Sequence, residues 1–214
     1  MSIVADDNAK LYATFSGSAM VSFNRGESWA LVGQVTEKFV SYIISRIHID
    51  PAVPQILYAN LTVEKIEDQA MYANRIAKSY DAGETWQLID VSPNITGSEI
   101  TIHAENTQKL LMIAGQGQGV LRSEDGGKTW VLSNTGINLI GNQLSIADNG
   151  VMYLVSDYNH YYKSIDAGQS WQTFTTQEPV SGVCNNFLLN PVQNSEIICQ
   201  SYEGLYLSKD VGKH

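Results

Sequence analysis

The sequence predicts an all-β chain, a β-propeller of about five recognisable four-stranded antiparallel blades with the last blade incomplete. One eight-residue pattern, S-x-D-x-G-x-[ST]-W, recurs along the chain. Its first serines lie at positions 22, 79, 123, 164 and 208, so the copies are 57, 44, 41 and 44 residues apart. A period in the low forties is typical of one four-stranded blade. Between the copies lie short apolar or alternating runs bounded by Gly, Asn, Asp and Pro, and no long segment has helical periodicity.

The repeated segment, called the box below, has the composition of a tight turn between two strands. The short carboxylate at its third position can accept hydrogen bonds from the turn's own N–H groups, and the glycine at the fifth can take a positive φ. The hydroxyl at the seventh position can bond locally, and the Trp that follows can cover the seam between neighbouring sheets. These structural roles need no substrate. They fall to Asp81, Gly83, Trp86, Asp125, Gly127, Trp130, Asp166, Gly168, Trp171, Asp210 and Gly212.

The pattern S-x-D-x-G-x-[ST]-W resembles the Asp-box, or bacterial neuraminidase repeat. This repeat occurs in sialidases, sortilin-type receptors, xyloglucan hydrolases and photosystem II assembly factors, all of which are β-propellers. In those families the box joins the third and fourth strands of a blade, on the face opposite the active site. The resemblance therefore implies that the box aspartates are not catalytic. It also favours an extracytoplasmic or secreted protein, although no signal peptide begins this sequence, so the compartment stays open.

A single domain is expected over residues 1–214, with each blade placed by its box. The approximate boundaries are 1–38, 39–92, 93–136, 137–178 and 179–214. The first blade opens on an innermost strand, and its box has Asn24 in place of Asp, which keeps an acceptor oxygen. The second blade has surplus residues around 61–71, between its second and third strands. Loops of that kind emerge on the face of a propeller that carries binding sites.

The remaining blades differ in the same loop. The third has alternating glycines at 115, 117 and 119, but no helical pattern or Lys-Ser pair follows them, so a phosphate-binding loop is not predicted.

The fifth blade stops at His214, where the repeat calls for a hydroxyl residue, a Trp and an outer strand. Two explanations stay open. The blade has three strands, or further sequence or another chain completes the propeller.

Composition narrows the class of partner. The chain has 13 Lys and Arg against 22 Asp and Glu, a net charge of −9, which argues against nucleic acid and anionic membranes. No apolar stretch reaches the roughly 18 residues that a membrane span needs. Cys184 and Cys199 flank one predicted turn, and two free thiols are expected there, with a disulfide as the alternative.

Neither a metal nor another cofactor is predicted. The four histidines have no ligand spacing with the cysteines. His48 and His103 are expected at equivalent positions of the repeat, which suggests a shared structural role.

Catalysis is one of two functions left open, and binding is the preferred one. The resemblance to sialidases implies three arginines that bind the substrate carboxylate. The four arginines of this sequence are too scattered to supply them. A xyloglucanase-like glycoside hydrolase would need two facing carboxylates. Its alternative candidates are Glu67, Asp68, Asp157 and Glu203.

Binding is favoured because flat aromatic rings with amide neighbours suit a sugar or peptide surface. The predicted function is a non-catalytic binding or assembly module that takes a glycan or a protein on the loops opposite the boxes. The candidate binding residues are Gln118, Tyr158, Asn159, His160, Tyr161 and Tyr202.

Overall fold

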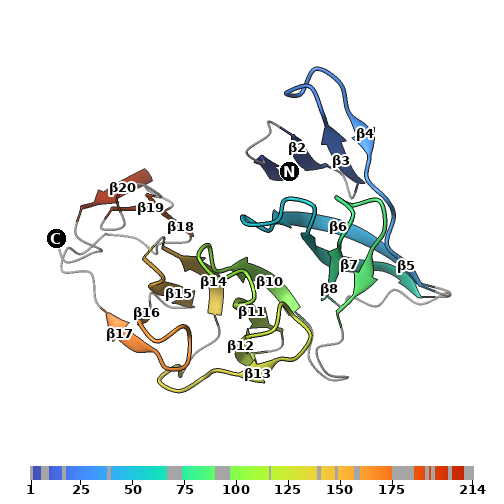
Figure 1. Cartoon of the computed structure of the whole chain (residues 1–214). Coiled ribbons are helices and arrows are strands. Elements are labelled where there is room, and N and C mark those ends of the chain that lie inside the picture. The colour runs from blue at the N-terminus through green and yellow to red at the C-terminus, as the bar shows by residue number, and fades with distance from the viewer. Residues whose placement is uncertain are drawn as a thin grey trace. The chain divides into compact units, whose positions relative to one another are not determined.

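The protein is an all-β chain in two compact units, residues Met1–Ile100 and Thr101–His214, and each is described by itself. The computed structural model describes residues 2–5, 10–15, 18–37, 40–66, 74–89, 97–115, 117–138, 141–147, 149–156, 160–174, 186–190, 193, 196–201 and 204–209. These residues form twenty strands in five antiparallel sheets (Figure 1). No helix in this part of the chain is long and apolar enough to cross a membrane.

The first unit contains two sheets. The first sheet has the order β1 (Ser2–Ala5), β2 (Leu11–Phe15), β3 (Ser18–Ser22), β4 (Ala30–Leu31). The second has the order β5 (Thr36–Glu37), β6 (Val40–Ile49), β7 (Leu57–Ile66), β8 (Asn74–Ser79), β9 (Gln87–Leu88). Four strands were expected in this second blade, and a loop around 61–71. Instead, residues 61–66 continue β7, and the lengthened β6 gains β5 as a further neighbour.

The second unit contains the other three sheets. The third sheet is β10 (Gly97–Ile102), which includes the boundary between the units, then β11 (Leu110–Ala114), β12 (Gly119–Ser123) and β13 (Val131–Leu132). The fourth is β14 (Gly141–Ile146), β15 (Met152–Ser156), β16 (His160–Ser164) and β17 (Gln172–Phe174). The fifth, within the described residues, is β18 (Asn186–Leu189), β19 (Ile197–Ser201) and β20 (Gly204–Ser208).

Every sheet is a meander with two distinct ends. In the third sheet, Leu110 pairs with Ser123 at the end where the box begins, which we call the box end. Ala114 pairs with Gly119 at the opposite end, which we call the loop end. Because neighbouring strands are antiparallel, the turn between the first two main strands also lies at the box end.

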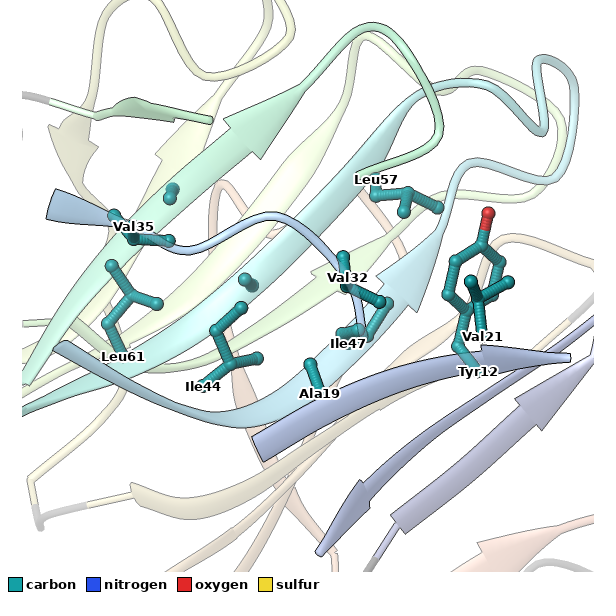
Figure 2. Packing of buried hydrophobic residues seen from close by; sticks show 11 residues of the cluster. Tyr12, Ala19, Val21, Val32, Val35, Ile44, Ile47, Leu57 and Leu61 are labelled. Carbon is teal, nitrogen blue, oxygen red and sulfur yellow. The ribbon is translucent and has the colours of Figure 1, made fainter. Parts of the chain in front are cut away.

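The sheets of the first unit pack through a shared apolar core. Tyr12 and Val21 of the first sheet lie against Ile47 and Leu57 of the second, and Figure 2 shows these side chains pointing toward one another. The Tyr12 hydroxyl reaches beyond the core and donates to the carbonyl oxygen of Ala82, 3.2 Å away. The first sheet is therefore bonded to the box of the second as well as packed against its strands.

The inner turns at the box end correct one predicted equivalence. The N–H groups of Asp50, His103 and Asn190 each donate to a carbonyl oxygen six residues later, at 3.0 Å. His103 is therefore equivalent to Asp50, whereas His48 lies inside β6, opposite Tyr58. The two histidines do not share a position of the repeat, and the prediction that they do is wrong.

Cys199, on β19, is disulfide-bonded, so the expectation of a free thiol there is also wrong. Cys184 lies outside the described residues.

Each described box closes around its serine and its third residue. In the second box, the Ser79 hydroxyl donates to Asp81 Oδ1 at 2.7 Å and accepts from the Gly83 N–H at 2.8 Å. Equivalent bonds form in the boxes that begin at Ser22, Ser123 and Ser164. Two consecutive residues are left-handed in each turn, the fourth and the fifth. The fourth is a residue other than glycine in three boxes: Arg25, Ala82 and Ala167, each with φ of 59°.

The boxes also bind the segment that follows the outer strand of the preceding sheet. The Gly33 N–H donates to the Gly83 carbonyl oxygen at 2.8 Å, and a Cβ on Gly83 would lie 2.5 Å from Val32 Cγ1. In the second unit, the Trp171 indole N–H donates to the Ser133 carbonyl oxygen at 3.0 Å. The box is thus a turn within one sheet and a contact to the sheet before it.

Two adjacent residues of the second box should respond oppositely to substitution. Gly83→Ala places a Cβ at φ +95° and against Val32, and is expected to destabilise the protein by about 2–4 kcal/mol. Ala82→Gly relieves a left-handed alanine at some cost in unfolded-state entropy, and is expected to stabilise by about 0–1 kcal/mol. Urea unfolding measures both. Equal losses of stability in the two variants would contradict this account of the turn.

Candidate functional site

Three of the predicted binding residues are described, and all three belong to the second unit. Gln118 lies in the turn between β11 and β12, and His160 and Tyr161 begin β16. These positions lie at the loop ends of the third and fourth sheets, opposite their boxes. The other predicted residues lie outside the described part of the chain: Glu67, Asp68, Asp157, Tyr158, Asn159, Tyr202, Glu203, Asp210 and Gly212.

The turn that carries Gln118 is held by a side chain from further along the sequence. Asn134 donates from Nδ2 to the Gln118 carbonyl oxygen at 2.6 Å and accepts the Val120 N–H on Oδ1 at 2.8 Å. A Cβ on Gly119, whose φ is +94°, would lie 2.2 Å from Asn134 Oδ1. The absence of a side chain at Gly119 therefore leaves the space that the Asn134 amide occupies. We call this pair of Asn134 hydrogen bonds the clamp. Asn134 follows the outer strand β13 and was not singled out in the sequence, because no other box is followed by an equivalent asparagine.

His160 and Tyr161 face different surroundings although they are adjacent. His160 pairs with Ser156 at the start of β16 and is exposed. Tyr161 pairs with Val155 and is half-buried against the core formed by Ala147, Tyr153, Val155 and Ile197. Much of the Tyr161 ring is thus occupied by packing, and His160 is the more accessible of the two.

One group of polar residues in the first unit, formed by Arg46, His48, Asn60 and Glu99, was not predicted as a site. Arg46 on β6 forms an ion pair with Glu99, at 2.5 Å between Nη1 and Oε1. The pKa of His48 is lowered to about 4, mainly by burial and also by the Arg46 charge, while a hydrogen bond with Asn60 opposes the shift. Burial also raises the pKa of Glu99, against the effect of Arg46. His48 is therefore neutral at physiological pH and cannot donate a second proton there.

This polar group is joined to the first sheet by hydrogen bonds around a bulge. The register of β6 against β7 shifts between Ile44 and Arg46, so Ser45 has no opposite residue. The Ser45 hydroxyl donates to the Asn60 carbonyl oxygen, and the Thr14 hydroxyl donates to the Ser45 carbonyl oxygen, both at 3.0 Å. These contacts make the group a polar part of the packing between the two sheets.

The box carboxylates act as acceptors and stay ionised. Asp81, Asp125 and Asp166 each accept the N–H of the seventh box residue at 2.9 Å and its hydroxyl on the second oxygen. The hydroxyl bonds are the largest cause that lowers each pKa, to about 2. A carboxylate in this state is a poor proton donor near neutral pH. Within the described residues, no His, Cys, Asp and Glu side chains are grouped as metal ligands would be.

Comparisons with known proteins agree with this architecture. The model of the Sortilin-Vps10 family (sortilin, neurotensin receptor 3) matches residues 118–214. The chain is similar to a GH74 enzyme of Niastella koreensis, with a TM-score of 0.71 and 16% identity over 99% of this chain. It is similar to the GH74 xyloglucanase of Xanthomonas campestris, with a TM-score of 0.70 and 18% identity over 99%. The chain has the β-propeller fold of these structures, and its residues 118–214 are similar to the Sortilin-Vps10 family.

The third similar structure is YCF48 bound to D1 peptide, which has a TM-score of 0.64 and 17% identity over 98% of this propeller. The propeller spans 37% of the length of both GH74 chains and 67% of the YCF48 chain. No curated protein matches it in sequence. The predicted all-β propeller fold is thus confirmed, and identities below 20% show the fold alone.

Acid should destabilise the propeller through its box carboxylates. Each folded pKa of about 2 lies below the unfolded value near 3.9, so the unfolded state binds more protons between these values. Their contribution is complete above about pH 4 and is lost as the pH falls toward about 2. In Asp125→Asn that loss should shrink, and urea unfolding at a series of pH values measures it.

The first box supplies the matched control. Asn24 already accepts the Ser28 N–H at 2.9 Å and donates to its hydroxyl at 2.9 Å. Asn24→Asp should therefore increase the acid-dependent loss while Asp125→Asn decreases it. The same pH dependence in both variants would disprove a role for the box carboxylates.

His48 should act in a separate, higher pH range. Its folded pKa of about 4 lies below the unfolded value near 6.5, so protonation of the unfolded state reduces stability as the pH falls from about 6.5 to 4. His48→Gln should flatten the stability profile in that range and leave the fall below pH 4 in place. A variant profile that still declines between these values would assign the decline to another group.

Proposed function

We propose that this propeller is a non-catalytic binding module that takes an extended peptide segment of a protein partner at the loop ends of its third and fourth sheets. The proposal rests on one arrangement: a clamped turn that carries Gln118 and an exposed His160 lie at the same end of sheets that share one apolar core. Both side chains carry hydrogen-bonding groups suited to peptide backbone and polar side chains. The net charge of −9 favours a segment without strong negative charge.

The clamp supports a binding role because it orders the turn before a ligand arrives. Asn134 bonds on both sides of Gly119, so the turn has little conformational entropy left to lose on binding. The box carboxylates lie at the other end of each sheet and are engaged in the turns themselves. YCF48, a solved structure of the same fold, is described as bound to a peptide, which supports peptide as the first ligand to test.

A peptide-display library selected on the wild-type protein would supply the probe, and fluorescence anisotropy of an enriched peptide would give its affinity. His160→Ala should weaken binding severalfold or more, because it removes an exposed side chain from the proposed surface. Asn134→Ala should weaken it as well, through loss of the ordered turn, and should also cost about 1–3 kcal/mol of stability. Lys128→Ala, an exposed change at the box end, is the matched control and should leave the affinity unchanged.

Two outcomes would refute the proposal. A selected peptide whose affinity falls in the Lys128 variant and not in the His160 variant would place binding at the box end. Release of reducing sugar from xyloglucan by the wild-type protein would make it an enzyme. Binding of xyloglucan oligosaccharides without cleavage, lost in His160→Ala, would keep the surface and change the ligand from peptide to glycan.

A further inference from the structure

Residues 133–135, which follow the outer strand β13, are bonded to the box of the fourth sheet at both ends. The Trp171 indole N–H donates to the Ser133 carbonyl oxygen at 3.0 Å, and the Trp171 backbone N–H donates to the Thr135 carbonyl oxygen at 2.9 Å. The Ser133 hydroxyl donates to the Gly168 carbonyl oxygen. These hydrogen bonds hold the segment against a single box.

The residue in the middle of this segment is Asn134, whose side chain makes the clamp. It donates to the Gln118 carbonyl oxygen at 2.6 Å and accepts the Val120 N–H at 2.8 Å, at the loop end of the third sheet. The box that holds its neighbours begins at the opposite end of the fourth sheet, the box end. Residues 133–135 thus connect the box end of one sheet with the loop end of the sheet before it.

The contact between this segment and the fourth box is buried and closely packed. Ser133 is 4% exposed and Trp171 is 3% exposed, and Trp171 belongs to the apolar core shared by the third and fourth sheets. A Cβ on Gly136 would lie 1.9 Å from the Trp171 carbonyl oxygen, so the backbone after the segment also lies directly against the box. A hydrogen bond shielded in this way is costly to break, because no water replaces the lost partner.

The docked segment occurs in two repeats, whereas the clamp belongs to one of them. In the first sheet the Val32 N–H donates to the Ala19 carbonyl oxygen, as the Ser133 N–H donates to that of Val120 in the third sheet. Gly33 therefore takes the position of the clamp asparagine, and its N–H is bonded to the second box at 2.8 Å. A glycine has no side chain that could reach a loop-end turn. The third sheet thus adds an amide to a segment that the next box already holds.

We propose that Trp171 is a positioning residue for the binding surface at the loop ends of the third and fourth sheets. By holding Ser133 and Thr135, it keeps Asn134 where its amide can order the Gln118 turn. This role rests on the function proposed above, since it explains how the turn is ordered before a peptide arrives. A peptide that binds only the clamped turn stabilises the same closed state that the Trp171 contacts favour.

Amide hydrogen exchange of the full chain without peptide, followed by NMR, tests the positioning step. Trp171→Phe keeps an aromatic ring and removes the indole N–H. Exchange of the Val120 N–H, which Asn134 Oδ1 accepts, should become about tenfold faster. The His103 N–H at the box end of the same sheet, bonded to the Lys109 carbonyl oxygen, is the reference and should exchange at its wild-type rate. A merely structural role of Trp171 would accelerate both amides.

Two further variants control for the change of a buried side chain. Ser133→Ala removes the hydroxyl bond to the fourth box without a large cavity, so it should accelerate Val120 exchange severalfold. Trp130→Phe loses an indole bond of 3.0 Å to the Gly127 carbonyl oxygen of its own box, and should leave the Val120 rate unchanged. An unchanged Val120 rate in the folded Trp171→Phe protein, or in Ser133→Ala if only that variant folds, would overturn the proposal, as would equal acceleration in Trp130→Phe.

The peptide selected on the wild-type protein separates this inference from the proposed function. A large excess of peptide over its Kd should slow Val120 exchange tenfold or more in the wild type and in Trp171→Phe, because only the clamped turn binds it. Unchanged Val120 exchange with a peptide that His160→Ala weakens would refute the link between clamp and binding surface while the proposed function stands. A peptide whose affinity ignores His160 would instead refute the proposed function, and exchange without peptide would still decide whether Trp171 positions the clamp.

Discussion

The structure depends on a left-handed turn that one serine hydroxyl and one short polar side chain hold closed. The serine accepts the N–H of the box glycine, and the aspartate accepts N–H and hydroxyl groups beyond it, so these polar groups are paired within the turn itself. The resulting backbone leaves no room for a side chain at Gly83, because Val32 of the preceding sheet approaches there. The left-handed turn and the packing of Val32 therefore both require glycine at position 83, which explains why the box pattern includes a glycine there.

The fold could be predicted because its signals are local and repeated. Within each box the bonds join residues two to four apart, so the pattern can be read directly from the sequence. Other features were not readable for physical reasons. Nothing in an alanine signals the left-handed conformation of Ala82, and the extra strand β5 depends on how far β6 extends. The predicted equivalence of His48 and His103 rested on residue type alone, whereas the backbone hydrogen bonds of the inner turns determine the register.

The candidate site was less predictable because its organising contact is not repeated. Asn134 lies 16 residues from Gln118 in sequence, and only the fold brings its amide to that turn. Tyr161 was selected as an aromatic loop residue, yet its register opposite Val155 directs it toward the core. His160 and Gln118 were found from their place in the repeat alone. The kinds of side chain at a loop end can thus be predicted from the sequence. Their orientation can be known only once the strand register is known.

The short span of the box bonds also bears on the order in which the chain can fold. Closing a loop of a few residues sacrifices little chain entropy, so a hairpin and its box can form without any other sheet. The contacts from a box to the preceding sheet join residues far apart in sequence, 38 residues for the Trp171 indole and 70 for the Tyr12 hydroxyl. These contacts can stabilise the protein only after both sheets have formed. Growth from one repeat to the next, as in other linear arrays, is the folding route that this arrangement favours.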